Sequence, residues 1–440
     1  MANSATATRG PSAVGERALA PDLARGFMLL LIALANTSWY LWGANRTADS
    51  VHPADGSLLD RITQFAIITG VDMRVYPMFA FLFGYGIVQL LDRQQRAGVP
   101  EGTARALLKR RHWWMIAIGG CHALLLWMGD IIGVYGAVGL VMCWLFVRRT
   151  DRTLLVWSAV LVGVLVVLSL LSVAGGVGMA AAGAAPQSGG EADLLGANIS
   201  NPDYVATLLP RVGVWLLLLV AQGFLMLTVP AAVLLAFWAA RRKILEQPHR
   251  HLRLLRTTAV GGILIGWLVG LPYALYHVGV LDVPDSAAWA FSLPNIASGL
   301  FAGLGYVALF ALIAHWLTVR RGAAAAGPRG STGNGNTGHR NTEHGPLVTA
   351  IAAVGKRSMS AYLAQSVLCA PLLAAWGLGL GGWFGSWQMA AFAVAVWLIT
   401  LAGAYALEIR GRRGPAEVLL RRLAYRTPTR TPTRAATPPS

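Results

Sequence analysis

Charged side chains are scarce in this sequence of 440 residues: they make up 12% of it, whereas 55% of the residues are hydrophobic. Few soluble proteins carry so large an apolar share, so the composition favours an integral membrane protein over a soluble enzyme. Acidic residues are scarcer than basic ones: the chain has 19 Asp and Glu but 36 Lys and Arg, which gives a net charge of +17. A soluble chain this basic would suggest a nucleic-acid partner, but the apolar majority leads us to expect none.

Several motifs that carry chemistry are also missing. The sequence has no His-Glu-x-x-His, Cys-x-x-Cys or Gly-x-Ser-x-Gly motif and no phosphate-binding loop ending in Lys-Ser/Thr. These absences argue against metalloenzyme, nucleotide-hydrolysing and serine-hydrolase chemistry, and we expect no metal and no bound cofactor. The three cysteines fall in apolar stretches, where a thiol usually behaves as a small hydrophobe.

The apolar residues gather in ten uncharged stretches near the length of roughly 17 to 25 residues that a bilayer-spanning helix needs. We therefore predict an all-α, polytopic helix bundle with about ten transmembrane helices and the lipid bilayer as its partner. No pattern indicates an oligomeric state. The predicted spans are residues 26–43, 75–91, 112–128, 131–147, 154–173, 212–240, 257–277, 291–319, 358–376 and 387–407.

The basic residues indicate which way the bundle faces. If the N-terminus is inside, ten spans leave only Arg46, Arg61, Arg74 and Arg211 of the 36 Lys and Arg outside. Cytoplasmic loops of membrane proteins carry the excess of Lys and Arg. The distribution therefore predicts that the N- and C-termini are both cytoplasmic, with the first span as an uncleaved signal anchor.

Outside the spans, composition divides the chain into a membrane domain and two tails. We assign residues 1–26 to a cytoplasmic N-terminal tail, 27–425 to the polytopic membrane domain and 426–440 to a disordered basic C-terminal tail. Residues 322–345, rich in Ala, Gly, Asn and Thr, have the composition of a flexible cytoplasmic linker. The outer loop 175–210 is long enough for a lid or a re-entrant turn, and its composition favours neither.

His122 is the first candidate for chemistry, because an ionisable side chain inside a bilayer costs free energy unless it has a partner or a watery cavity. It lies eleven residues after Arg111, a spacing that puts Arg111 on nearly the same helix face, about 16 Å nearer the cytoplasm. His122 acts either as a general base, since imidazole titrates near neutral pH, or as a histidine hydrogen-bonded between helices. Asp130, just beyond the same span, either orients that imidazole or is a solvated turn residue.

The other polar residues in or near spans are candidates for substrate binding. Asp22 and Arg25, three residues apart at a helix start, are expected to pair, and Asn36 follows Arg25 by eleven residues. Arg74, at the mouth of the second span, either pairs with Asp72 or Asp130, binds an anion, or snorkels to the interface. The remaining candidates are Arg111, Tyr362 and Gln365. Tyr362 and Gln365 either face a pore or hydrogen-bond to a neighbouring helix. Glycines at 262, 266 and 270 predict close helix packing rather than chemistry.

The order of these motifs resembles the YeiB-like family of bacterial membrane proteins, a domain of unknown function numbered 418. The resemblance implies a multi-pass protein of the bacterial plasma (inner) membrane without a settled activity. It rests on Asp22-x-x-Arg25-Gly26-Phe27 with Asn36, Phe79-x-Phe81-Leu82-Phe83-Gly84, His122-x-Leu124-Leu125-x-Trp127-x-Gly129-Asp130-Ile131, Ser360-Ala361-Tyr362-Leu363-x-Gln365-Ser366 and Gly414-Pro415-x-Glu417.

The first span also looks like that of membrane acyltransferases, in one group of which an Arg and a His stand eleven residues apart on one helix. Here Asn36 takes the place of that His, and Asn cannot act as a base. An acyltransferase would therefore need His122 and Asp130 as its catalytic residues and acyl-CoA as a co-substrate, with a lipid, sugar or envelope acceptor. The alternative function is transport of a small polar or anionic solute, with the same polar residues as a binding site.

Overall fold

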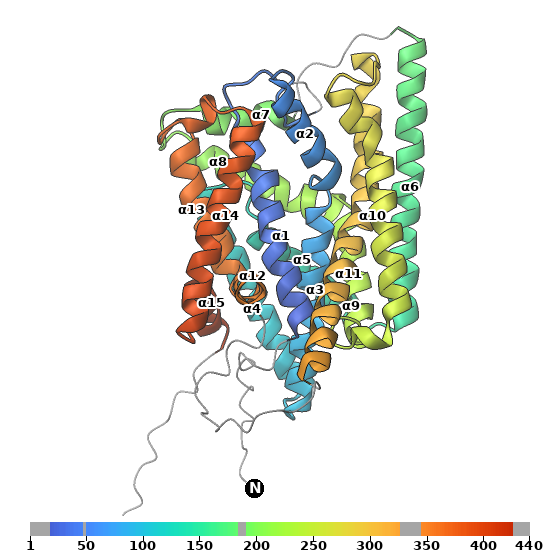
Figure 1. Ribbon diagram of the computed structural model, residues 1–440, viewed down its shortest axis with the longest axis vertical. Coiled ribbons are helices and arrows are strands. Elements are labelled where there is room, and N and C mark those ends of the chain that lie inside the picture. The colour runs from blue at the N-terminus through green and yellow to red at the C-terminus, as the bar shows by residue number, and fades with distance from the viewer. Residues whose placement is uncertain (1–17, 47–49, 184–190, 326–344, 426–440) are drawn as a thin grey trace, which may run out of the picture.

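The helical prediction can be compared with a computed structural model of the protein, which describes residues 18–46, 50–183, 191–325 and 345–425 (Figure 1). In these ranges the chain forms helices and no β-strand, apart from one isolated antiparallel bridge between Arg46 and Pro53. The predicted all-α class is confirmed. Seven helical segments are long and apolar enough to cross a membrane, so the chain is a multi-pass membrane protein.

The helices follow one another along the chain with short connections. They are α1 (Leu19–Thr37), α2 (Leu58–Gly70), α3 (Val75–Arg96), α4 (Glu101–Leu125), α5 (Ile131–Phe146), α6 (Asp151–Ala181), α7 (Glu191–Ser200), α8 (Leu208–Val220), α9 (Thr228–Arg241), α10 (Leu252–His277), α11 (Ser292–Ala325), α12 (Pro346–Lys356), α13 (Ser358–Leu373), α14 (Ser386–Ile409) and α15 (Pro415–Ala424).

Every predicted span overlaps a helix, but one of them is divided. The span predicted at 212–240 consists of α8 and α9, which are separated by a π-helical turn at Ala221–Leu225. A continuous apolar run does not reveal such a break, because hydropathy is the same whether the backbone continues or turns. Helices α5, α9 and α13 are apolar but only 14 to 16 residues long, so they fall below the length of the seven long segments.

Two predicted domain boundaries also differ from the helix ends. Helix α1 begins at Leu19, inside the predicted N-terminal tail, because Asp22 and Arg25 there pair and pack instead of remaining in solvent. Helix α11 continues to Ala325, into the predicted linker. The rest of that linker up to residue 344, residues 1–17 of the N-terminal tail and the whole predicted tail 426–440 lie outside the described residues.

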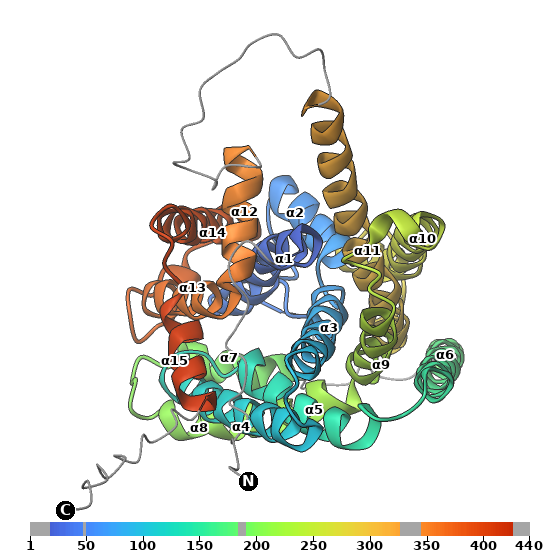
Figure 2. The same cartoon turned by 90° about the horizontal axis from the view of Figure 1, so that it is seen from below.

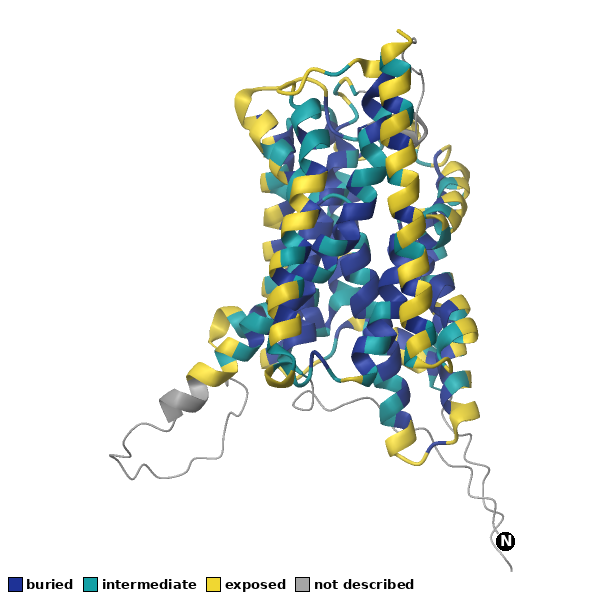
Figure 3. Ribbon diagram, turned by 90° about the vertical axis from the view of Figure 1, so that its right-hand side faces the viewer, coloured by how far each residue is buried: buried dark blue, intermediate teal, exposed yellow. Residues whose placement is uncertain are grey.

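Helix α1 occupies the middle of the bundle. Seen from below, it is enclosed by α3, α11, α12, α13 and α14 (Figure 2), and it packs against all five. Helices α6 and α10 lie at the periphery (Figure 2), and exposed residues line the outer side of the bundle (Figure 3). Many of the exposed residues on these two helices are aliphatic. An exposed apolar surface of this extent fits contact with lipid chains.

Glycines bring α10 and α11 into close contact, as predicted. A Cβ atom added at Gly262 would lie 2.4 Å from the carbonyl oxygen of Phe301, and one at Gly266 would lie 2.3 Å from the Cβ of Ala302. Real Cβ atoms do not approach other heavy atoms this closely, so only glycine allows the two backbones to meet here.

Candidate functional site

A buried histidine–aspartate pair joins the end of α4 to the start of α5. His122 is on the last turn of α4, and Asp130 is the residue that caps the N-terminus of α5. His122 Nδ1 lies 2.8 Å from Asp130 Oδ1, and the second carboxylate oxygen accepts a hydrogen bond of 2.6 Å from the backbone N–H of Gly133. Asp130 is 1% exposed. The interpretation of Asp130 as a solvated turn residue is therefore wrong.

This geometry defines what the imidazole can do. An imidazole that donates its Nδ1 proton to a carboxylate keeps a lone pair on Nε2. His122 Nε2 is buried and has no hydrogen-bond partner among the described residues. A nitrogen oriented by a carboxylate on one side and free on the other is arranged to accept a proton from a bound molecule.

Glycine allows the carboxylate to reach this position. A Cβ added at Gly119, one turn before His122, would lie 2.3 Å from Asp130 Oδ2, and a Cβ at Gly133 would lie 2.6 Å from the ring of Trp215. Substitution of either glycine would push α4, α5 and α8 apart. The site therefore depends on a close helix contact that the His and Asp residues alone do not reveal.

Tyr362 of α13 forms another wall of the site. Its ring meets the ring of His122 edge-on with centroids 5.4 Å apart. Its hydroxyl lies 3.4 Å from both the carbonyl oxygen of Gly129 and the backbone nitrogen of Ile131, the residues on either side of Asp130. The motif around Tyr362 and the motif around His122, far apart in sequence, thus meet in the fold.

Asn36 contributes from α1 to a cavity beside the pair. The cavity has a volume of about 10 Å³ and is lined by Ile32, Asn36, Val75, Tyr76, Phe79, Ile131 and Tyr135. That is room for about one water molecule. Ile131 directly follows Asp130, so the cavity lies near the pair, although neither His122 nor Asp130 lines it. A substrate would fit only after side chains move.

Other predicted site residues lie in different interfaces. Arg74 is fully buried against α10 and α11, where it donates to Asn295 Oδ1 at 2.5 Å, to the carbonyl of Gly266 at 2.8 Å and to the carbonyl of Asp72 at 2.7 Å. Its burial contradicts the snorkelling interpretation. Gln365 donates to the carbonyl of Leu29 at 3.3 Å, which fits the interpretation that it hydrogen-bonds to a neighbouring helix.

The charged residues near the other end of the bundle also make contacts apart from the pair. The predicted pairing of Asp22 with Arg25 is confirmed at 3.6 Å, and Arg25 also donates to the carbonyl of Leu82 at 2.9 Å. Arg111 is half-buried on α4, eleven residues before His122. The structure thus brings together His122, Asp130 and Tyr362, with Asn36 on a nearby cavity that Ile131 also lines. It leaves Asp22, Arg25, Arg74, Arg111 and Gln365 outside this group.

The segment from α7 to the start of α8, which we call the outer segment after its predicted side of the membrane, covers the end of α4. The hydroxyl of Tyr204 and the guanidinium of Arg211 donate to the carbonyl of Leu125 at 2.9 Å and 3.2 Å. The guanidinium also stacks over the rings of Tyr204 and Trp376, at 5.0 Å and 5.3 Å. The sequence identified Arg211 only as an arginine predicted to lie outside, because no spacing indicates that the start of α8 will pack on the end of a helix 86 residues earlier.

Within the part of the chain that the structure describes, no group of three or more His, Cys, Asp and Glu side chains is placed to hold a metal ion. The polar centre at His122 is a two-residue pair, with the Tyr362 ring against the imidazole.

Comparisons with known proteins identify relatives along nearly the whole chain. YeiB of Escherichia coli (strain K12) is 27% identical over 428 residues, which is 93% of this chain and 97% of that protein. YxaH of Bacillus subtilis (strain 168) is 32% identical over 160 residues, covering 34% of this chain and 37% of that protein. Both relatives are described as uncharacterised, and no solved structure matches the chain significantly.

The family match falls on the C-terminal half. The family described as "Protein of unknown function (DUF418)" matches residues 239–330 and 337–427. These ranges contain the motifs around Tyr362 and Glu417, while the match to YeiB extends the similarity to the N-terminal half. The chain belongs to the YeiB-like DUF418 family.

Proposed function

We propose that the protein transfers an acyl group from acyl-CoA to a hydroxyl or amine of a lipid, sugar or envelope acceptor, with His122 as the general base. The observation that carries the proposal is the pair itself: Asp130 Oδ1 lies 2.8 Å from His122 Nδ1, and Nε2 has no hydrogen-bond partner among the described residues. A buried carboxylate that orients an imidazole is the arrangement that activates weak nucleophiles in many enzymes.

The proposed step conserves atoms and charge. The acceptor O–H or N–H gives its proton to His122 Nε2 as its oxygen or nitrogen attacks the thioester carbonyl of acyl-CoA. The C–S bond breaks, and the departing thiolate takes the proton back from His122. The products are the acylated acceptor and free coenzyme A, and Asp130 stabilises the imidazolium that exists between the two transfers.

The surrounding residues support this role in different ways. Tyr362 places a hydroxyl beside the turn that holds Asp130, and Asn36 adds an amide to the neighbouring cavity. The outer segment held at Leu125 by Tyr204 and Arg211 covers the end of α4. Because the cavity holds about one water, we infer that this segment or the aromatic wall moves when an acceptor binds.

We further propose ten membrane crossings, both termini in the cytoplasm, and a location in the bacterial inner membrane. In support, α1 begins and α15 lies at the same end of the bundle, the lower end in Figure 1. The distribution of Lys and Arg assigns this end to the cytoplasm. The domain division remains a proposal of the same kind, with residues 27–425 as the membrane unit.

The test is mass spectrometry of lipids and envelope glycans from a bacterial strain that lacks the gene and carries wild-type, His122→Ala or His112→Leu protein. His112 is a buried histidine on the same helix, so its substitution is a matched control. Acylated species should appear with wild type and His112→Leu and disappear with His122→Ala at equal protein abundance. Equal acylation with His122→Ala would overturn the proposal, as would solute movement with no covalent product in any strain.

A further inference from the structure

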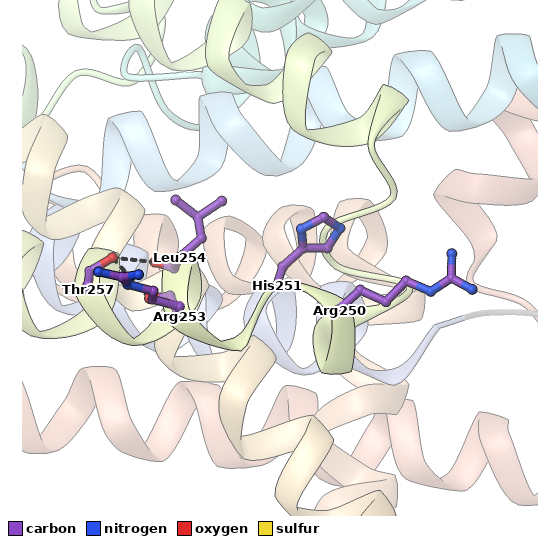
Figure 4. A pocket seen from close by; sticks show the side chains of 5 residues that line it. All are labelled: Arg250, His251, Arg253, Leu254 and Thr257. Carbon is purple, nitrogen blue, oxygen red and sulfur yellow. Dashed lines mark hydrogen bonds between the residues drawn. The ribbon is translucent and has the colours of Figure 1, made fainter.

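A basic pocket lies at the start of α10, away from the histidine–aspartate pair. It has a volume of about 450 Å³ and is lined by Arg250, His251, Arg253, Leu254 and Thr257. Figure 4 shows Arg250 and Arg253 at opposite sides of the pocket, with His251 and Leu254 between them in this view. All five residues come from the connection after α9 and the first turns of α10, on the side predicted to be cytoplasmic.

Among the residues that the structure describes, no carboxylate neutralises the positive charge of this pocket. No acidic side chain lines it, and among the described residues no carboxylate forms an ion pair with Arg250 or Arg253. The hydroxyl of Thr257 donates within its own helix, to the carbonyls of Arg253 and Leu254 at 3.0 Å each. Two guanidinium groups around an open hollow are well suited to bind a phosphate.

An apolar surface continues from the pocket along α10. At 100° per residue, Leu264 and Leu268 lie within about 20° of Thr257 on the helix face. Their side chains are 51% and 63% exposed. A Cβ at Gly261, between them and the pocket, would have no atom within 4 Å, so the surface is open at this position too. The face thus combines a cationic end with an aliphatic strip directed into the membrane.

We propose that this face binds one anionic phospholipid, with its phosphate between Arg250 and Arg253 and an acyl chain along Leu264 and Leu268. Charge complementarity selects the headgroup, because a zwitterionic lipid brings a cation into a site that already holds two. The aliphatic strip selects a lipid over a soluble anion, which would contact only the polar half. This site is independent of the acyl transfer proposed above and involves none of its residues.

The direct experiment is native mass spectrometry of the full-length protein in detergent, titrated with dioleoyl phosphatidylglycerol or dioleoyl phosphatidylcholine. The wild type should retain phosphatidylglycerol with higher affinity than phosphatidylcholine. Each arginine near an anionic headgroup contributes about fivefold in affinity, so Arg250→Gln with Arg253→Gln should weaken phosphatidylglycerol binding by about 25-fold. As a matched control, Arg421→Gln with Arg422→Gln removes two exposed arginines from α15 and should change the affinity by less than about twofold.

Two further measurements keep the proposal open to refutation. The single exposed variant Arg250→Gln should fold even if the double variant does not, and it should lose about fivefold in affinity. Leu264→Ala with Leu268→Ala should weaken phosphatidylglycerol binding about threefold or more. Unchanged binding in the arginine variants, equal binding of phosphatidylcholine, an equal loss in the α15 control, or glycerol 3-phosphate binding as tightly as the lipid would each overturn the assignment.

Discussion

His122 Nδ1 and Asp130 Oδ1 lie 2.8 Å apart across the turn between α4 and α5. Both side chains are buried, at 4% and 1% exposure, in a region where an ionisable group without a partner is costly. The carboxylate is further held by the backbone N–H of Gly133 at 2.6 Å. The pair is thus fixed by the helix start itself, and it leaves one imidazole nitrogen for chemistry.

Asp130→Asn tests whether the carboxylate orients the imidazole. Asn caps a helix nearly as well as Asp, so its amide oxygen should keep the bond to Gly133. Its NH₂ group would then face His122 Nδ1 and favour the tautomer that carries the proton on Nε2. We expect acyl transfer to fall by about 10²- to 10⁴-fold, measured by mass spectrometry of the acylated product. The thermal midpoint in detergent should change by less than about 4 °C.

The control for that variant is His112→Leu on the same helix. Neither ring nitrogen of His112 has a hydrogen-bond partner among the described residues, and the side chain is fully buried. Leucine removes two buried polar atoms and fills a similar volume, so stability should be unchanged or higher. An activity loss as large as that of Asp130→Asn would show that α4 tolerates no change, and the assignment of a base would lose its support.

Gly270→Ala should be strongly destabilising. Its Cβ would lie 2.0 Å from Arg74 Nη2 and 2.8 Å from Asn295 Oδ1, so the guanidinium would have to leave its buried hydrogen bonds. Breaking a buried, hydrogen-bonded cation away from its partners costs about 3 to 5 kcal/mol. Gly261→Ala is the matched control and should be slightly stabilising. No atom lies within 4 Å of the added Cβ, and alanine favours the helix over glycine by about 1 kcal/mol. Thermal unfolding in detergent separates the two, and equal midpoints would contradict the packing argument.

Glu417→Ala should loosen the start of α13. Glu417, on α15, accepts hydrogen bonds from the backbone N–H groups of Met359 and Ser360 at 2.9 Å and 3.1 Å and from the hydroxyl of Ser360. Loss of a helix cap costs about 1 to 2 kcal/mol, and here it would also release the helix that carries Tyr362. We expect a lower thermal midpoint, with Glu417→Gln recovering part of the loss because an amide oxygen still accepts. Full stability in Glu417→Ala would show that the cap is redundant.

Arg211→Ala should release the outer segment without unfolding the bundle. The variant loses the hydrogen bond to Leu125 and the stacking over Tyr204 and Trp376. Without these contacts the segment should open locally about fivefold to tenfold more often. Hydrogen exchange of the amides at 199–207 measures this directly. Arg61→Ala, an exposed arginine also predicted to face outside, is the control and should leave that exchange unchanged. Faster exchange throughout α4 and α13 would indicate general unfolding instead.

Local spacing predicted those features that depend on one helix and its immediate neighbour. The Asp22–Arg25 pair and the glycine packing of α10 followed from intervals of three and four residues, since such positions share a helix face. The division of residues 212–240 and the burial of Arg74 did not follow. A π-helical turn leaves hydropathy unchanged, and Arg74 is buried through contacts to Gly266 and Asn295 that lie 192 and 221 residues away.

The sequence by itself determined that this is a multi-pass helical membrane protein, because its apolar stretches are long enough to span a bilayer and its charges are confined between them. It also drew attention to His122 and Asp130 as polar residues in and beside an apolar span. Only the tertiary structure decided that these two residues meet, that Tyr362 joins them and that Arg74 does not. Such meetings depend on how helices far apart in the chain pack, and a glycine at position 119 matters to that packing as much as the polar side chains do.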